Sequence, residues 1–201
     1  MVSLKAKYKY DMEDSELEKY VSKEEDQVIK KLKEALKPCV GVDPVLEKLA
    51  KEGKYYLSVV SSSALRRVRA SIEKVGQDKF FKHEGEYLYS KCMGSVLTNI
   101  HADVFSAATS LPKPTSKPDP AIYIYAMEKL GKKPEECVAV EDSKSGATAA
   151  FRANIKTIGY TGSYEPEKEA EITEILKKAG CQVIMKDWSE FEDALAKIEA
   201  L

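Results

Sequence analysis

The chain has 201 residues, of which 43% are hydrophobic and 32% are charged, and its formal net charge is −1. This length suits one domain, or one domain with an appendage, and the composition is typical of a globular protein with a buried core. Because 32 basic and 33 acidic residues nearly cancel, the charge balance argues against nucleic acid and anionic membranes as partners.

The first forty residues have a helical rather than a β-α pattern. Glu24 to Lys37 places apolar residues on one stripe, which predicts an amphipathic helix. Pro38 and Gly41 end this helix, and Pro44 to Ala50 predicts another short one. We interpret residues 1–40 as an N-terminal segment with a small helical appendage, and residues 41–201 as the main domain.

From Lys54 onward, short apolar runs alternate with helical patterns. The predicted strands are Tyr55–Val60, Val104–Ala107, Cys137–Val140, Ile155–Tyr160 and Cys181–Met185. The intervening helices are expected from about Ala64, after Asp119-Pro120, and over Ser143–Ala153, Pro166–Lys178 and Ser189–Ile198. Such alternation predicts an α/β fold whose mainly parallel sheet carries helices on both faces. Residues 82–100 interrupt the rhythm, and we interpret them as an insertion.

Polar residues follow several of these strands where a parallel sheet binds its ligands, at the carboxyl ends. Ser61 and Ser62 follow the first strand, and hydroxyl and amide groups at a helix start bind phosphate oxygens. Lys117 would neutralise a phosphoryl group. Glu141 and Asp142 follow the third strand, and adjacent carboxylates suit Mg²⁺. Together these residues predict a site for phosphate and magnesium.

Each motif also has a purely structural interpretation. Ser61 to Ser63 could cap the helix that begins near Ala64, and Lys117 could be a solvated loop residue. Glu141-Asp142-Ser143 could form a helix N-cap with acids that complement the helix dipole. The matching position of all three motifs in successive β-α units favours the site.

The motifs Val59-Val60-Ser61-Ser62-Ser63, Ser116-Lys117-Pro118-Asp119-Pro120 and Val140-Glu141-Asp142-Ser143-Lys144-Ser145-Gly146 resemble the second, third and fourth motifs of the haloacid dehalogenase-like hydrolases. The likeness covers about residues 38–160 and is to the capped sugar-phosphate phosphatases and phosphomutases. It implies a Rossmann-like core, a Mg²⁺ cofactor and phosphoryl transfer through an aspartyl-phosphate. It also implies that Ser61 binds phosphate, that Lys117 stabilises nucleophile and phosphate, that Glu141 and Asp142 hold magnesium, and that the Glu24–Lys37 helix is part of an incomplete cap.

The family's first motif, an apolar strand ending in Asp-x-Asp, is not found. Leu4 to Tyr10 precedes an acidic stretch that includes Asp11, but it alternates apolar residues with three lysines. A central parallel strand is buried on both faces, where unpaired lysines cost several kcal/mol each. This segment is therefore expected at an edge or in a hairpin with residues 87–89, and Asp11 is not expected to be a nucleophile. In the resembled fold the missing strand lies between those ending at Val60 and Val140, which must close on each other or accept another segment or subunit.

Two function classes follow. The chain is either a Mg²⁺-dependent phosphatase of small phosphorylated metabolites whose nucleophile comes from elsewhere, or a non-catalytic protein that binds phosphate, metal or a partner. We expect the chain alone to be inactive, and exposed sheet edges would favour a homodimer. Its four cysteines form no C-x-x-C pair and are expected to be reduced. The N-terminus lacks the apolar core of a signal peptide and no apolar stretch would span a bilayer, which predicts a cytoplasmic protein.

Overall fold

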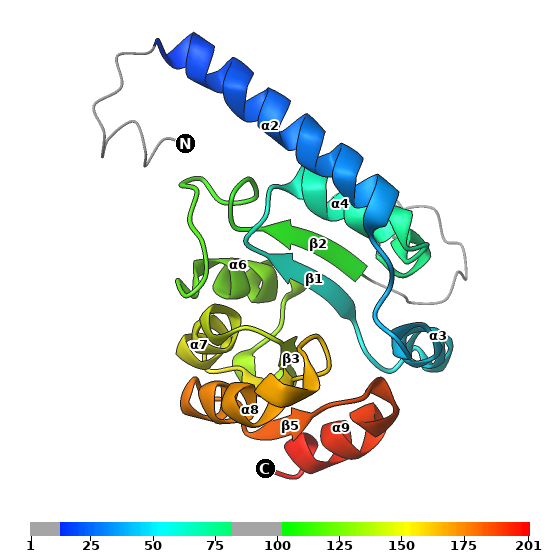
Figure 1. Cartoon of the computed structure of the whole chain (residues 1–201). Coiled ribbons are helices and arrows are strands. Elements are labelled where there is room, and N and C mark those ends of the chain that lie inside the picture. The colour runs from blue at the N-terminus through cyan, green and yellow to red at the C-terminus, as the bar shows by residue number, and fades with distance from the viewer. Residues whose placement is uncertain (1–12, 82–101) are drawn as a thin grey trace, which may run out of the picture.

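The computed structural model describes residues 13–81 and 102–201. It is an α/β structure in which helices and strands alternate after an N-terminal pair of helices (Figure 1). The helices are α2 (Asp14–Ala35), α3 (Val42–Glu52), α4 (Leu65–Lys74), α6 (Ala121–Leu130), α7 (Lys144–Arg152), α8 (Glu169–Lys178) and α9 (Phe191–Glu199). The strands are β1 (Leu57–Ser61), β2 (Ala102–Ser106), β3 (Val138–Glu141), β4 (Lys156–Tyr160) and β5 (Val183–Met185), and single 3-10 turns cover Asp78–Phe80, Pro134–Glu136, Pro166–Lys168 and Trp188–Glu190.

Every strand pair is parallel, as predicted, but the strands form two sheets instead of one. β1 pairs with β2, and β3, β4 and β5 form a second sheet in that order. Within the described ranges, β1 and β3 neither pair with each other nor share a strand between them. The expected single sheet is therefore divided at the position where the sequence lacks a suitable apolar strand.

Helices cover both faces of the second sheet, as the alternation predicted (Figure 1). On one face, Leu49 of α3 joins Phe191 and Ile198 of α9 in a cluster with the β4 residue Ile158. On the other face, α7 packs through small residues, including Ala149, against Tyr123 and Met127 of α6. These clusters hold the helices that surround the carboxyl ends of the strands.

Helix α2 is longer than expected and begins ten residues before Glu24. Its first turns carry few apolar residues, so the apolar stripe revealed only the second half, while charged residues with good helix propensity extend it. α2 lies across α4 (Figure 1), and Arg66 of α4 pairs with Glu25 (3.6 Å) and Asp26. Because Arg66 and Asp26 are both more than half exposed, their pair contributes little to stability, whereas the Glu25 side chain is only 18% exposed. The expected hairpin partner segments and the insertion at 82–100 lie outside the described residues.

Among the described residues, the cysteines at 39, 137 and 181 are free thiols. None of the helices in the described ranges combines the length and the apolar character needed to cross a membrane.

Cys181 gives the protein a predictable pH dependence. Burial, with a smaller contribution from the charge of Glu141, raises the pKa of the Cys181 thiol from 9.0 to about 12. Since the unfolded thiol ionises first, its contribution to stability is complete below pH 9 and is lost between pH 9 and pH 12, by about 1.4 kcal/mol per pH unit. Urea unfolding at pH 8 to 11 should show a shallower decline for Cys181→Ala than for the parent chain. Parallel declines would contradict the assignment.

Candidate functional site

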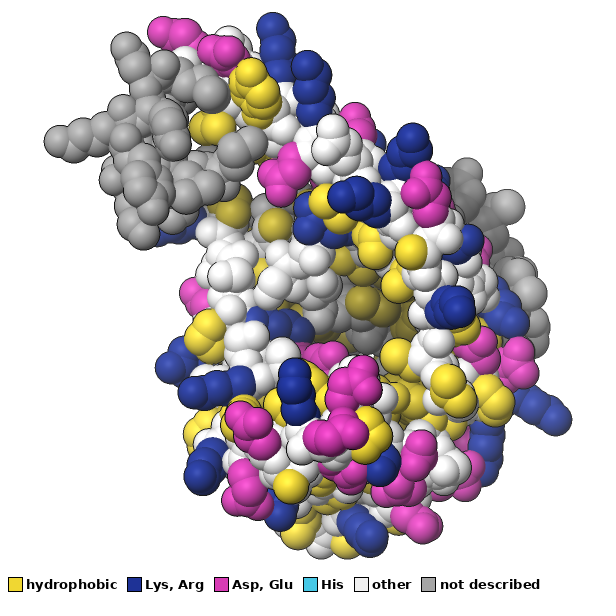
Figure 2. All heavy atoms as spheres, viewed as in Figure 1, with side chains coloured by type: hydrophobic (Ala, Val, Ile, Leu, Met, Phe, Trp, Pro, Cys, Tyr) yellow, Lys and Arg dark blue, Asp and Glu magenta, His cyan; other side chains and the backbone are white. Residues whose placement is uncertain are grey.

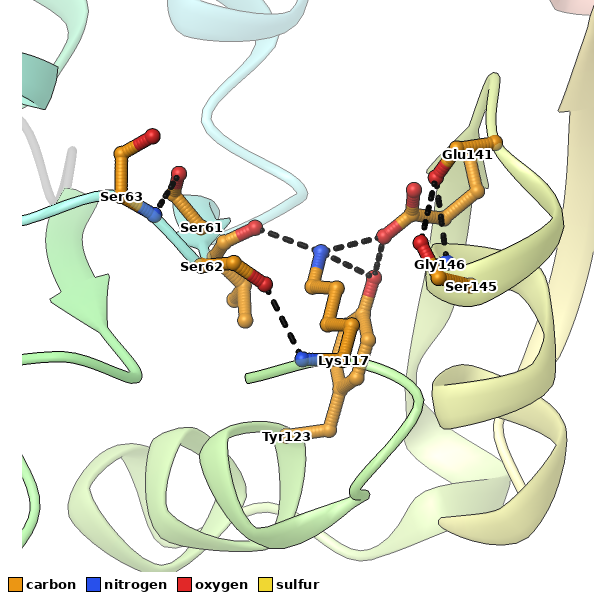
Figure 3. Close-up of polar contacts among 10 residues, drawn as sticks. Ser61, Ser62, Ser63, Lys117, Tyr123, Glu141, Ser145 and Gly146 are labelled. Carbon is orange, nitrogen blue, oxygen red and sulfur yellow. Dashed lines mark hydrogen bonds and ion pairs between the residues drawn. The ribbon is translucent and has the colours of Figure 1, made fainter. Parts of the chain in front are cut away.

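The two parallel sheets place the carboxyl ends of β1 and β3 at one rim, where Lys117 connects them. The Lys117 Nζ donates a hydrogen bond to the main-chain carbonyl of Val60, at 2.8 Å, and forms an ion pair with Glu141. Figure 3 shows the Lys117 side chain extending between the serine turn after β1 and Glu141 at the end of β3. The sequence prediction that Lys117 and Glu141 meet at one rim is therefore confirmed in its geometry.

Lys117, Glu141 and Tyr123 form a buried polar cluster. The Lys117 and Glu141 side chains are 9% and 8% exposed, and Tyr123 is also buried. The Tyr123 hydroxyl donates to Glu141 Oε1, and the Lys117 Nζ lies 3.4 Å from that hydroxyl and 4.7 Å from the ring centroid. Burial and the Glu141 charge raise the pKa of Tyr123 well above its ordinary value, so it stays a neutral hydrogen-bond donor. The cluster balances one buried cation with one buried anion.

Sequence reasoning missed Tyr123 because its neighbours on α6 formed a plausible apolar helix face. The missed signal is its position six residues after Lys117, in the first turn of a helix that begins at the rim. A buried tyrosine hydroxyl needs a polar partner, and Glu141 at the rim provides it. Sequence reasoning also missed the role of Gly146, the last residue of the motif that contains Glu141. A Cβ atom at this position would lie 1.8 Å from Glu141 Oε2, so Gly146 leaves room for the carboxylate.

The serines after β1 bind the loop that carries Lys117 instead of capping a helix. The Ser62 Oγ accepts the main-chain N–H of Lys117 at 3.0 Å, and the Ser61 Oγ accepts that of Ser63 at 3.1 Å. Helix α4 has Ala64 at its N-cap and no side-chain cap, so the interpretation of the serines as caps is wrong. Both hydroxyl groups retain a proton that they can donate to an anion.

The adjacent acids Glu141 and Asp142 have different surroundings, since Glu141 is buried and Asp142 lies at the surface. Asp142 is exposed, and its main-chain carbonyl accepts a hydrogen bond from Tyr164 at 3.0 Å. Burial and, to a smaller extent, the charge of Asp142 raise the pKa of the Cys39 thiol. Ser143 caps α7 by accepting the N–H of Gly146, which confirms the N-cap interpretation for that residue.

The donor set fits a magnesium ion only in part. In residues 13–81 and 102–201, no group of three His, Cys, Asp or Glu side chains is placed to hold a metal. Mg²⁺ uses one or two carboxylates together with water and substrate phosphate. Asp142 offers an exposed carboxylate, whereas the Glu141 carboxylate is already bound by Lys117 and Tyr123.

The family model for haloacid dehalogenase-like hydrolases matches residues 3–154 of the chain. The chain is 28% identical to the phosphorylated carbohydrates phosphatase of Thermotoga maritima over 142 residues, which are 71% of the chain and 55% of that protein. It is 44% identical to hexitol phosphatase B of Escherichia coli over 57 residues, 28% of the chain and 26% of that protein. The chain thus spans about half or less of these curated relatives.

Solved structures share the fold at lower identity. A family IA hydrolase of this type from Entamoeba histolytica superposes with a TM-score of 0.66 and 22% identity, over 98% of this chain and 77% of that one. CbbY from Rhodobacter sphaeroides, solved with xylulose-1,5-bisphosphate, gives a TM-score of 0.62 and 19% identity, over 90% and 68%. The arrangement of helices and strands is therefore that of this group.

Proposed function

The chain belongs to the haloacid dehalogenase-like hydrolase family, and from this premise we propose that its rim binds the phosphate group of a small phosphorylated metabolite. The observation that carries the proposal is the convergence of Lys117, Ser62 and the end of β1 on one rim. A phosphate dianion requires several hydrogen-bond donors. The rim offers a buried ammonium, two serine hydroxyls and the main-chain N–H groups of the loop before α4. The sugar-phosphate and hexitol phosphatases named above make a phosphorylated sugar or polyol the favoured substrate class.

We further propose that Mg²⁺ would bind at Asp142, with Glu141 joining it if its carboxylate is released from Lys117. When bound, the ion would neutralise charge on the phosphate oxygens. The chain's own residues would do the rest: Lys117 orients and neutralises the phosphate, Ser61 and Ser62 donate hydrogen bonds, and Tyr123 fixes the position of Lys117. In the described residues, no third metal-binding side chain joins Glu141 and Asp142. This supports weak binding of Mg²⁺ to the chain alone.

Hydrolysis by this chain alone is not part of the proposal. A phosphoryl-transfer site needs a nucleophile and a proton donor within hydrogen-bond reach of the phosphate. Among the described residues, Glu141 is the carboxylate that touches Lys117, and it is bound by two donors. The non-catalytic alternative inferred from the sequence, a protein that binds phosphate, metal or a partner, is therefore the function we favour for the isolated chain.

We expect no turnover of p-nitrophenyl phosphate or of hexose phosphates above the uncatalysed rate, even at high protein concentration with Mg²⁺. Inorganic phosphate should still bind, as measured by calorimetry, and Ser62→Ala should weaken that binding severalfold by removing one donor. Hexitol phosphatase B serves as the positive control for the assay. Turnover that Lys117→Ala abolishes would show that the isolated chain is an enzyme, whereas absence of phosphate binding would remove the proposed site.

A further inference from the structure

Helix α4 begins without a capping side chain from its own turn. Its N-cap residue is Ala64, and a methyl group cannot accept the N–H groups of the first helical turn. The acceptor comes instead from the loop after β2, where the Thr109 Oγ accepts the N–H of Leu65 at 3.2 Å. These two residues are 44 positions apart in the sequence. Thr109 therefore caps α4 from outside the helix.

The Thr109 hydroxyl belongs to a chain of hydrogen bonds with a fixed direction. Ser106, at the end of β2, is fully buried, and its Oγ lies 2.9 Å from the Thr109 Oγ and 2.7 Å from the main-chain oxygen of Ser63. A carbonyl oxygen can only accept, so Ser106 gives its proton to Ser63 and Thr109 gives its proton to Ser106. The chain of donors thus runs from the Leu65 N–H to the Ser63 carbonyl. We call its two middle members, Ser106 and Thr109, the hydroxyl clamp.

The loop after β2 holds the hydroxyl clamp in place. The Ser106 N–H donates to the Ser110 Oγ at 3.0 Å. The Thr115 N–H donates to the Ala107 carbonyl at 2.9 Å, which brings the two ends of the loop together. Leu111 packs against a buried cluster between β2 and α6. With polar and apolar anchors of its own, this loop fixes the clamp side chains independently of α4.

The same loop continues into Lys117, and it therefore contacts the turn after β1 at both of its ends. The Lys117 N–H donates to the Ser62 Oγ at 3.0 Å. The turn is thus held at Ser62, at Ser63 and at Leu65 by hydrogen bonds from one loop. The serines of this turn and Lys117 border the hollow in the middle of the molecule (Figure 2).

Capping from outside leaves the serine hydroxyls at the rim available. A serine that caps its own helix directs its oxygen at the N–H groups of the first turn. Here Thr109 provides that oxygen, so the hydroxyls of Ser61 and Ser62 can donate to an anion. Donors that are already held in place bind more tightly, because the ligand does not have to order them. The hydroxyl clamp therefore prepares the turn for binding.

We propose that Ser106 and Thr109 are positioning residues for phosphate, which set the shape of the turn after β1 without touching the anion. This inference rests on the proposed function, because that turn belongs to the phosphate site described there. A hydroxyl network with a structural role alone would stabilise the fold and leave the phosphate affinity of the folded protein unchanged. The affinity of the folded protein is therefore the deciding quantity.

A pair of substitutions at Thr109 separates the hydroxyl from the rest of the side chain. Thr109→Val keeps the shape and removes the hydroxyl, whereas Thr109→Ser keeps the hydroxyl, and both should fold because Thr109 is exposed. In calorimetry of the full chain with inorganic phosphate, Thr109→Val should raise the Kd about fivefold, which corresponds to one lost helix cap. Thr109→Ser should bind within about twofold of the parent chain.

Ser71→Ala is the matched control. It removes another hydroxyl of α4, one that donates to the Arg67 carbonyl at 2.9 Å further along the helix. The phosphate Kd of this variant should equal that of the parent chain. A weakening equal to that of Thr109→Val would overturn the proposal, because any lost hydroxyl on or against α4 would then have the same effect.

Combining changes at the two clamp residues tests whether they act together. Ser106→Ala removes the donor to Ser63 and the acceptor for Thr109, so it should also weaken phosphate binding. Adding Thr109→Val to Ser106→Ala should then cost less than about fivefold, since part of the chain is already broken. All variants are compared well below their Tm, where nearly every chain is folded. A full fivefold loss in both backgrounds would show that the hydroxyls act separately and would overturn the clamp.

Amide hydrogen exchange observes the cap without phosphate. The Leu65 N–H should exchange about tenfold faster in Thr109→Val, and the Ile72 N–H of the same helix should exchange at the parent rate. Unchanged exchange at Leu65 would overturn the cap. Phosphate binding that neither Thr109→Val nor Ser106→Ala weakens would overturn the positioning role alone. Absence of phosphate binding by the parent chain would remove the proposed function, and this inference with it.

Discussion

Lys117→Met should lower the free energy of unfolding by about 3–5 kcal/mol, the usual cost of leaving one charge of a buried ion pair without its partner. Methionine has a similar length and fills the space, so the loss reports the missing ammonium and not a cavity. The Glu141 carboxylate would retain Tyr123 as a donor but no cation, at 8% exposure. Urea unfolding at pH 7 measures the change.

Two matched variants make this expectation specific. Lys117→Met combined with Glu141→Gln removes the uncompensated charge and should recover much of the loss. Lys48→Met breaks the ion pair of Lys48 with Glu192, two side chains that are 50% and 63% exposed. This variant should lower the free energy of unfolding by less than about 1 kcal/mol. If the Lys117 and Lys48 variants lost stability equally, the buried cluster would not be a strong determinant of the fold.

Gly146→Ala should destabilise the protein by about 3 kcal/mol, although the same exchange in an ordinary helix stabilises by roughly 0.5–1 kcal/mol. Gly146 lies inside α7, where alanine is the better helix former. The added Cβ would lie 1.8 Å from Oε2 and 2.3 Å from Cδ of Glu141. The carboxylate would have to shift beside Lys117, so the variant adds steric strain and weakens the ion pair.

A shorter acid should relieve the strain. Glu141→Asp withdraws the carboxylate by one methylene group, so Gly146→Ala should cost less in that background than in the parent chain. The difference between the two costs, measured by urea unfolding, isolates the contact between these two positions. Equal costs in both backgrounds would show that Gly146 does not act through Glu141.

The order of elements was predictable because strands buried on both faces are apolar throughout and the helices between them are amphipathic. The strand ending at Ser61 and the one ending at Glu141 were placed within two residues of their observed ends. The rim followed from the same logic, since carboxyl ends of parallel strands meet on one side. The partition at residue 40 and the metal ligands Glu141 and Asp142 stay predictions.

Other features depend on long-range packing and could not be read from local patterns. The ion pair of Lys117 with Glu141 joins residues 24 positions apart, and either residue alone is typical of a solvated surface. Tyr123 resembled an ordinary core residue of α6. The start of α2 was missed because charged residues, not an apolar stripe, carry the helix back to Asp14. The sequence indicated that the strand between β1 and β3 was missing. It did not predict that these two strands would belong to separate sheets.

Within residues 13–81 and 102–201, one flank of β1 is unpaired, which has a consequence for the behaviour of the chain in solution. Exposed strand edges are normally guarded by lysine, proline or a bulge, because bare edges recruit other chains. β1 reads Leu57-Ser58-Val59-Val60-Ser61 and carries none of these guards. Short uncharged stretches rich in β-branched residues are the usual seeds of aggregation. Covering this flank of β1 would therefore keep the protein dispersed, and leaving it bare would favour precipitation.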